Sequence, residues 1–296
     1  MYDAISANRV RTVVLVAVFI AIVAAIGYIV GELTFPGAGL TALPFAVGLA
    51  SVSSVGAYFG GDQLVLAQSR AREIAAGKEP LLRNTVEALA IGLGIPTPKI
   101  FVIEDPAPNA FATGRDPKHA SIAVTRGLLE KLDKTELEGV LAHELSHVGN
   151  YDIRLMLLVA VLVGTIALLS DWILRTAFYG GRRRDRDRGS GGILLLVGFA
   201  LALLTPVIAA LIQMAVSRQR EYLADASGAL LTRYPQGLAN ALRKIAADPV
   251  PLAVANKATA ALWIWPPLKE HGAFMDGLFD THPPIAERIR RLEAMG

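Results

Sequence analysis

One stretch decides the fold of this chain: residues 135–148, which read TELEGVLAHELSHV. Thr135 followed by Glu138 fits a capping box, in which a hydroxyl residue at the N-cap is followed three residues later by a glutamate. This pattern predicts a helix that starts at Thr135 and continues through Ala142 to Val148. Two histidines lie near the end of this helix, and their spacing indicates a chemical role.

Residues 143–147 of the predicted helix read His-Glu-Leu-Ser-His. A spacing of four places the side chains of His143 and His147 on one helical face, where both reach a single tetrahedral zinc ion. Glu144, next to the first ligand, is then placed to act as the general base in the hydrolysis of a peptide bond. The alternative is that the two histidines hydrogen-bond inside a helix core, which would leave a costly buried glutamate uncompensated.

A third ligand should come from another helix, because a catalytic zinc ion has three protein ligands and one open position. Residues 221–225 read Glu-Tyr-Leu-Ala-Asp, and Glu221 offers a carboxylate for the metal. Asp225, one turn later, could accept the free ring N–H of a ligand histidine and fix its orientation. It could equally pair with Arg218 or Arg220 as a solvated acid.

The chain has no cysteine, which excludes disulfides, thiolate zinc ligands and a cysteine nucleophile. We therefore expect one Zn²⁺ per chain, held by histidine and carboxylate side chains. Zinc is the default metal, since a site with two histidines and one glutamate also accepts other first-row ions. Asn150 and Asp152, just beyond the motif, are expected to cap or brace the helix that carries the ligands.

The composition indicates a membrane protein. Of the 296 residues, 53% are hydrophobic, and the mean hydropathy of +0.45 is too high for an ordinary soluble domain. Charged residues still make up 19% and are concentrated in two blocks, so part of the chain folds in water. The net charge of +3 comes largely from arginines beside apolar runs, which indicates orientation in a lipid bilayer and no nucleic-acid surface.

Four apolar runs are candidates for membrane helices. Residues 13–31 are nearly free of charge and long enough to span a bilayer, whereas residues 41–60 are diluted by serines and glycines that favour close helix packing. Residues 155–174 and 193–216 predict a second hairpin. Basic residues flank the first hairpin at both ends and predict that these ends are cytoplasmic. They are Arg9, Arg11, Arg70, Arg72 and Lys78.

The loop of the second hairpin conflicts with that orientation. It is rich in arginine, so the positive-inside rule would keep it in the cytoplasm, yet it must lie outside if both runs cross the bilayer fully. Either the rule fails here or the hairpin is re-entrant, and both alternatives stay open. The charged residues of the loop are Arg175, Arg182, Arg183, Arg184, Asp185, Arg186, Asp187 and Arg188.

The sequence predicts a mainly α-helical membrane protein with about four membrane-embedded helices and an α+β zinc-metallopeptidase domain that contains a small sheet. Residues 81–93 favour a helix, and residues 99–104 and 121–125 favour strands. The predicted units are a membrane hairpin at 1–61, the metallopeptidase domain at 62–152 together with 217–296, and a second membrane hairpin at 153–216.

Three separated motifs occur in the order typical of one family: HELSHVGNYD at 143–152, RQREYLAD at 218–225 and THPP at 281–284. With them, almost the whole chain resembles the HtpX-type membrane zinc metallopeptidases, to which the CAAX prenyl proteases are distantly related. The resemblance implies that His143, His147 and Glu221 are zinc ligands, that Glu144 is the general base, and that Asp225 orients a ligand.

The resemblance also implies residues that border the catalytic centre. His282 and Arg288 are candidate stabilisers of the transition state. Residues 109–112 match an extended segment near the active cleft, and an exposed strand edge there could hold the substrate backbone by strand addition. An ordinary hairpin strand is the alternative. The segment consists of Asn109, Ala110, Phe111 and Ala112.

The implied role is quality control of membrane or misfolded proteins in a bacterial plasma membrane, with several membrane spans and the catalytic domain on the cytoplasmic face. The ligand helix ends about five residues before an apolar run, so the zinc ion should lie near the membrane surface. Two alternatives are a membrane scaffold whose zinc is structural, with His282 as fourth ligand, and an endoprotease for prenylated proteins.

Overall fold

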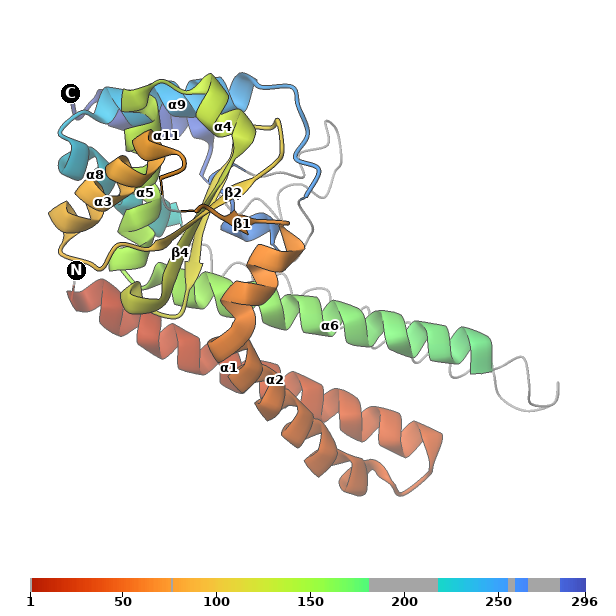
Figure 1. Cartoon of the computed structure of the whole chain (residues 1–296). Coiled ribbons are helices and arrows are strands. Elements are labelled where there is room, and N and C mark those ends of the chain that lie inside the picture. Colours follow the sequence, from red (N-terminus) through yellow and green to blue (C-terminus); the bar gives the residue numbers. More distant parts are fainter. Residues whose placement is uncertain (1, 76, 181–217, 255–258, 266–282) are drawn as a thin grey trace.

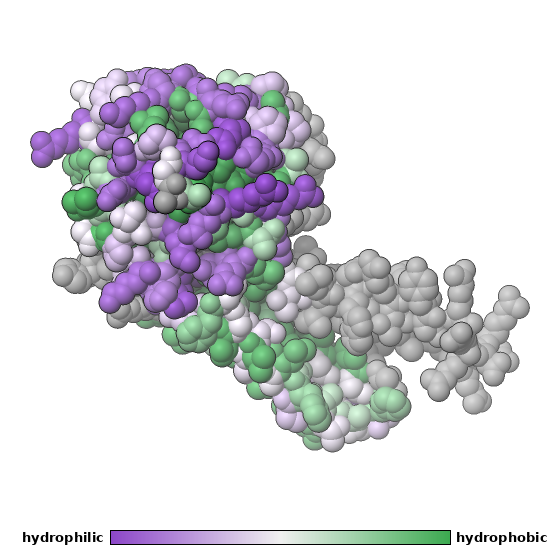
Figure 2. Space-filling model, in the orientation of Figure 1, coloured by the Kyte–Doolittle hydropathy of each residue, from purple (hydrophilic) through white to green (hydrophobic). Residues whose placement is uncertain are grey.

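The computed structural model describes residues 2–75, 77–180, 218–254, 259–265 and 283–296. Long helices extend from one side of an α+β domain (Figure 1). Figure 2 shows hydrophobic side chains gathered over the helical hairpin below and hydrophilic side chains over the domain above. This division matches the two solvents that the composition predicts.

The N-terminal hairpin consists of α1 (Tyr2–Thr34) and α2 (Gly39–Gln68). Within the described chain, Ser6–Glu32 and Gly39–Gln68 are long and apolar enough to cross a membrane. Small residues let the two helices touch: a Cβ added at Gly27 would lie 2.3 Å from the Cβ of Ala46. The two predicted spans, residues 13–31 and 41–60, lie inside these helices.

The next long helix, α6 (Asp152–Gly180), packs against α1 and α2. Buried apolar side chains from all three helices form this contact, among them Leu15, Phe19, Ala57, Leu155 and Leu158. The helix contains the third predicted run and also Arg175, which the sequence had placed in the following loop. The run 193–216 and the arginines from Arg182 to Arg188 lie outside the described residues, so the rest of the second hairpin stays a prediction.

The domain contains a four-stranded sheet in the order β1-β2-β4-β3. The central strands β2 and β4 are parallel, and each outer strand is antiparallel to its neighbour. The predicted strands at 99–104 and 121–125 correspond to β2 and β4. The strands are β1 (Arg72–Glu73), β2 (Lys99–Ile103), β3 (Ala110–Gly114) and β4 (Ala120–Thr125).

Helices surround α5 (Lys134–Gly149), which is buried along most of its length. Apolar side chains from this helix, from the sheet and from the neighbouring helices form one core. The predicted helix at 81–93 is α3. The other elements among the described residues are α3 (Pro80–Leu93), α4 (Arg126–Lys131), α8 (Arg218–Thr232), α9 (Pro235–Ala247), α11 (Ile285–Glu293) and two 3-10 turns, Pro117–His119 and Ala260–Leu262.

The N-terminus of α5 corrects the predicted capping box. The cap is Asp133, whose carboxylate accepts hydrogen bonds from the backbone N–H groups of Thr135 and Glu136, while Glu136 accepts one from the N–H of Asp133. The box therefore lies two residues before the predicted pair of Thr135 and Glu138. Aspartate is at least as good an N-cap as threonine, and Glu136 also pairs with Lys244 of α9.

The last turns of α2 pack against the sheet of the domain. Val65 and Leu66 are buried in a second core cluster with Ile103 of β2 and Phe111 of β3. The predicted boundary at residue 61 therefore falls inside a continuous helix. The described helical content, the small mixed sheet and the apolar helices confirm the predicted fold class.

Candidate active site

The two histidines of the motif lie one turn apart on α5 and face the same point. Their rings are perpendicular, with centroids 4.7 Å apart, and the two Nε2 atoms are separated by 3.2 Å. Both side chains are buried. The i, i+4 spacing on a straight helix produces this arrangement, as the sequence predicts.

Helix α8 brings Glu221 to the same point from the other side. Its carboxylate oxygens lie 3.8 Å from Nε2 of His143 and 3.5 Å from Nε2 of His147. Two nitrogens bound to one tetrahedral zinc ion lie about 3.3 Å apart. The donor set and its separations therefore fit zinc, and among the described residues these three form a group that could hold a metal ion.

The close approach of α8 to α5 depends on a glycine. A Cβ added at Gly228 would lie 3.1 Å from the backbone nitrogen of His143, closer than most such contacts. With hydrogen at this position, α8 lies directly against the ligand helix. Glu221, two turns earlier on α8, then reaches the histidines.

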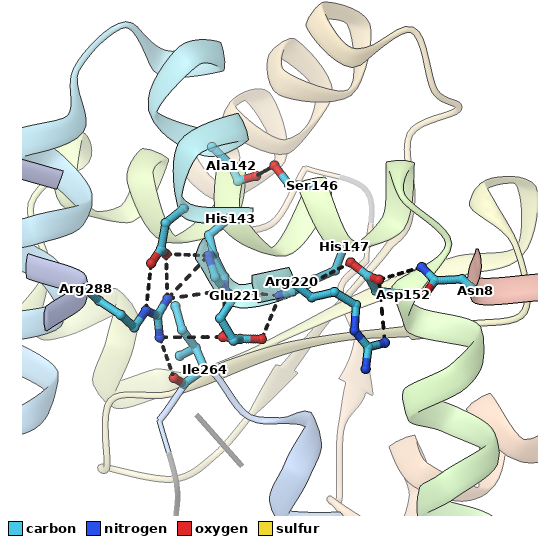
Figure 3. Close-up of polar contacts among 11 residues, drawn as sticks. Asn8, Ala142, His143, Ser146, His147, Asp152, Arg220, Glu221, Ile264 and Arg288 are labelled. Carbon is cyan, nitrogen blue, oxygen red and sulfur yellow. Dashed lines mark hydrogen bonds and ion pairs between the residues drawn. The ribbon is translucent and has the colours of Figure 1, made fainter. Parts of the chain in front are cut away.

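Each histidine has a carboxylate on its other ring nitrogen (Figure 3). Nδ1 of His143 lies 2.9 Å from Asp225 of α8, and Nδ1 of His147 lies 3.1 Å from Asp152 at the start of α6. A carboxylate at Nδ1 fixes the proton there and leaves the Nε2 lone pair for a metal. Both histidines are therefore held with Nε2 toward Glu221.

Arg288 of α11 forms a buried ion pair with Asp225. Its guanidinium donates two hydrogen bonds to that carboxylate, from Nε at 2.9 Å and from Nη2 at 2.7 Å, and its Nη1 lies 3.7 Å from Glu221. Burial alone would raise the pKa of Asp225, but the adjacent guanidinium of Arg288, together with the contact to His143, outweighs this and lowers the pKa to about 2. Asp225 is therefore ionised and held between an arginine and a histidine.

Glu144 is buried beside His143 and contacts the end strand of the sheet. Its carboxylate accepts a hydrogen bond from the backbone N–H of Ala112, and burial raises its pKa to about 7. The carboxylate thus lies between the ligand helix and β3. This is the position that a general base needs if the substrate backbone lies along β3.

The segment 109–112 includes the first residues of β3, and several of its hydrogen-bonding groups already have partners within the chain. The backbone N–H of Ile264 donates to the carbonyl of Ala110 at 3.0 Å, and the side chain of Asn109 exchanges hydrogen bonds with the backbone of Trp265. Phe111 packs edge-on against Trp263, with ring centroids 4.7 Å apart. The strand lies at the sheet edge, but its residues are buried, in contrast to the exposed edge that the sequence predicted.

Three features of the site were not apparent from the sequence. Asp152, expected to brace a helix end, contacts His147, and Arg220, a suggested partner of Asp225, lies 3.7 Å from Asp152 instead. Asn8 of α1 also reaches Asp152. Sequence spacing gives no signal for these contacts, because they depend on how separate helices meet. His282 lies outside the described residues.

Two histidines and a glutamate around one point, a glutamate beside them and apolar helices next to the domain define a membrane zinc metallopeptidase. The model of "Peptidase family M48" matches residues 76–296. The chain therefore belongs to peptidase family M48, which confirms the resemblance found in the sequence.

Individual relatives are similar in sequence to this chain over its full length. The chain is 46% identical over 295 residues to "Protease HtpX homolog" of Dictyoglomus thermophilum, covering 100% of this chain and 95% of that protein. It is 46% identical over 296 residues to the protein of the same name from Tropheryma whipplei, covering 100% of this chain and 99% of that protein. The crystal structure of S. mikatae Ste24p shares the fold, with a TM-score of 0.51 and 21% identity, covering 99% of this chain and 67% of that one.

Proposed function

We propose that this metallopeptidase hydrolyses internal peptide bonds of membrane and misfolded proteins at the surface of the bilayer, as part of protein quality control. One observation carries this proposal: the ligand helix α5 turns into the apolar helix α6 within a few residues, at an angle of 85°. The metal ligands therefore lie beside the membrane-embedded part of the chain. A site in that position can act on chains that emerge from the bilayer.

In this proposal His143, His147 and Glu221 hold one Zn²⁺. When bound, zinc supplies Lewis acidity that polarises the scissile carbonyl and acidifies water. Glu144 accepts the proton of the attacking water and passes it to the leaving nitrogen. Its place next to His143 and at Ala112 puts this carboxylate between the metal ligands and the substrate strand.

Asp225 and Asp152 orient the two histidines, and Arg288 keeps Asp225 ionised and in place. Arg288 contacts both Asp225 and Glu221, so it helps to position the proposed metal ligands. This role does not depend on whether Arg288 also stabilises the transition state. That second role, and the role of His282, stay predictions.

Residues Asn109 to Ala112 are the proposed binding strand for the substrate backbone. β3 pairs with β4 on one side. On its other side the carbonyl of Ala110 accepts from Ile264 and the N–H of Ala112 donates to Glu144, so a bound substrate strand would take the place of these contacts. A peptide that pairs with this side would be held largely by main-chain hydrogen bonds. Such binding demands little of the substrate sequence, which suits a peptidase with many substrates.

The proposed location is a bacterial plasma membrane, with the catalytic domain in the cytoplasm. Arg11 lies near the start of α1, and Arg70 and Arg72 follow α2, whereas the loop between the two helices has no lysine or arginine. We keep residues 62–152 and 217–296 as the metallopeptidase domain, with hairpins at 1–61 and 153–216 as its membrane parts.

Substrate choice tests this proposal against its alternatives. Protein reconstituted in liposomes should cleave both an unfolded casein-type protein and a single-span membrane protein, and a prenyl group on a peptide should make no difference to its cleavage. A strict requirement for the prenyl group would favour the prenyl-protein endoprotease. Zinc in the protein without cleavage of any substrate would favour a scaffold with structural zinc.

A further inference from the structure

The side chain of Asn8 lies far from the metal ligands in sequence but is buried next to them. It belongs to the membrane helix α1, and only 3% of its surface is exposed. Its Nδ2 donates one hydrogen bond to the carbonyl of Asn150 at 3.1 Å and one to Oδ1 of Asp152 at 2.7 Å. Both partners can only accept, so the orientation of the amide is determined by its neighbours.

The two contacts of Asn8 stabilise the sharp turn between α5 and α6, residues 149–152, which we call the α5–α6 corner. Asn150 is the C-cap of α5, and its carbonyl is among those that lack a partner within the helix. Tyr151, which follows, has a positive φ of 62°, an uncommon conformation for a bulky residue. An unfavourable backbone conformation of this kind is kept when contacts with the surrounding structure outweigh its cost. Asn8 makes one such contact just before Tyr151 and one just after it.

Asp152 transmits this restraint to the metal site. Its Oδ2 contacts Nδ1 of His147 at 3.1 Å, while its Oδ1 faces Asn8 at 2.7 Å and Arg220 at 3.7 Å (Figure 3). The carboxylate can rotate only if it gives up one of these contacts. A fixed carboxylate keeps the imidazole of His147 at the angle at which Nε2 faces His143 and Glu221.

We propose that Asn8 is a positioning residue of the active site: membrane helix α1 holds, through Asn8, the Asp152 carboxylate that orients the metal ligand His147. The inference rests on the proposed role of His147 as a zinc ligand. It makes zinc affinity depend on the docking of α1 against the α5–α6 corner. A purely structural Asn8 would anchor α1 to the domain without affecting the metal.

A double-mutant cycle on the full-length protein in detergent micelles separates these two roles. The variants are Asn8→Ala, Asp152→Ala and the combination, and the first readout is the affinity for zinc, measured by competition with a zinc-binding dye. The second readout is the melting temperature of the zinc-free protein, and the third is the change in kcat compared with that in KM. Outer partners of metal ligands typically change affinity by about 10-fold to 100-fold.

Thr12→Ala is the matched control on the same helix. The hydroxyl of Thr12 donates to the backbone carbonyl of Asn8, within α1, at 2.8 Å, so its removal leaves the contacts of Asn8 with the corner intact. This variant should bind zinc like the unsubstituted protein. If Asn8→Ala does not fold, Asn8→Leu, which removes the amide donor at a similar volume and adds no charge beside Asp152, is measured in the same way.

The proposal expects weaker zinc binding and a lower kcat for Asn8→Ala with little change in KM. It also expects the double variant to bind zinc no more weakly than Asp152→Ala, because Asn8 acts through that carboxylate. Unchanged zinc affinity with a lower melting temperature would overturn it, as would additive losses in the double variant. Failure of the proposed function is distinguishable, because the unsubstituted protein would then bind no zinc or cleave nothing.

Discussion

Oδ1 of Asp225 lies 2.9 Å from Nδ1 of His143, and both side chains are buried. The same carboxylate accepts two hydrogen bonds from Arg288, so one aspartate joins α5, α8 and α11. His143, the proposed metal ligand, is thus fixed by a buried charged pair. Stability and metal binding should depend on the same residue.

Replacing Asp225 by alanine should therefore have two effects. The guanidinium of Arg288 loses its buried partner, which should lower the free energy of unfolding by about 3–5 kcal/mol. His143 loses the group that orients it, which should weaken zinc binding about 10-fold to 100-fold. Chemical denaturation of the zinc-free protein and dye competition measure the two effects separately.

Glu287→Ala is the control for that change. Glu287 pairs with Arg290 and Arg291 on the solvent-exposed side of α11, the helix that also carries Arg288. Removing an exposed pair should leave both stability and zinc affinity almost unchanged. Equal effects from Asp225→Ala and Glu287→Ala would contradict the importance of the buried pair.

The contact between α8 and α5 leads to a second prediction. In Gly228→Ala the new methyl group meets the backbone of Ala142 and His143, so α8 must move and take Glu221 with it. We expect a loss of roughly 1–3 kcal/mol in stability together with weaker zinc binding. Gly56→Ala is the matched control, since a Cβ there meets nothing within 4 Å, and neither quantity should fall.

The absence of cysteine in the sequence allows a direct test of orientation. Single cysteines are introduced by Phe35→Cys, at the tip of the α1–α2 hairpin, and by Glu87→Cys, on the exposed face of α3. A maleimide that cannot cross membranes should label the first in intact cells without a wall, and the second only after lysis. The opposite pattern would place the catalytic domain outside the cytoplasm.

Much of this architecture could be predicted because it depends on local spacing. Two histidines four residues apart on a helix must share a face, and long apolar runs favour membrane helices, whatever the rest of the chain does. The predicted ligand Glu221 also lies where it was expected, on a second helix. The capping box was misplaced by two residues because Asp133 and Thr135 both suit an N-cap.

The remaining features depend on contacts between distant segments. Asn8 and Asp152 are separated by 144 positions, and nothing in either local sequence indicates that they meet. The pairing of Asn109 with Trp265 across the edge of β3 is equally long-range. Such contacts are determined by how helices pack, and a single sequence contains no pattern for them.

The central claim is that Glu144 is the base of a zinc endopeptidase, and one measurement tests it most directly. The zinc content of the purified protein and of Glu144→Gln is determined together with cleavage of a casein-type substrate, before and after chelation. We predict about one zinc ion per chain in both proteins. We also predict a loss of about 100-fold to 10,000-fold in cleavage for the variant and none left after chelation. Undiminished cleavage by the zinc-loaded variant would contradict the account.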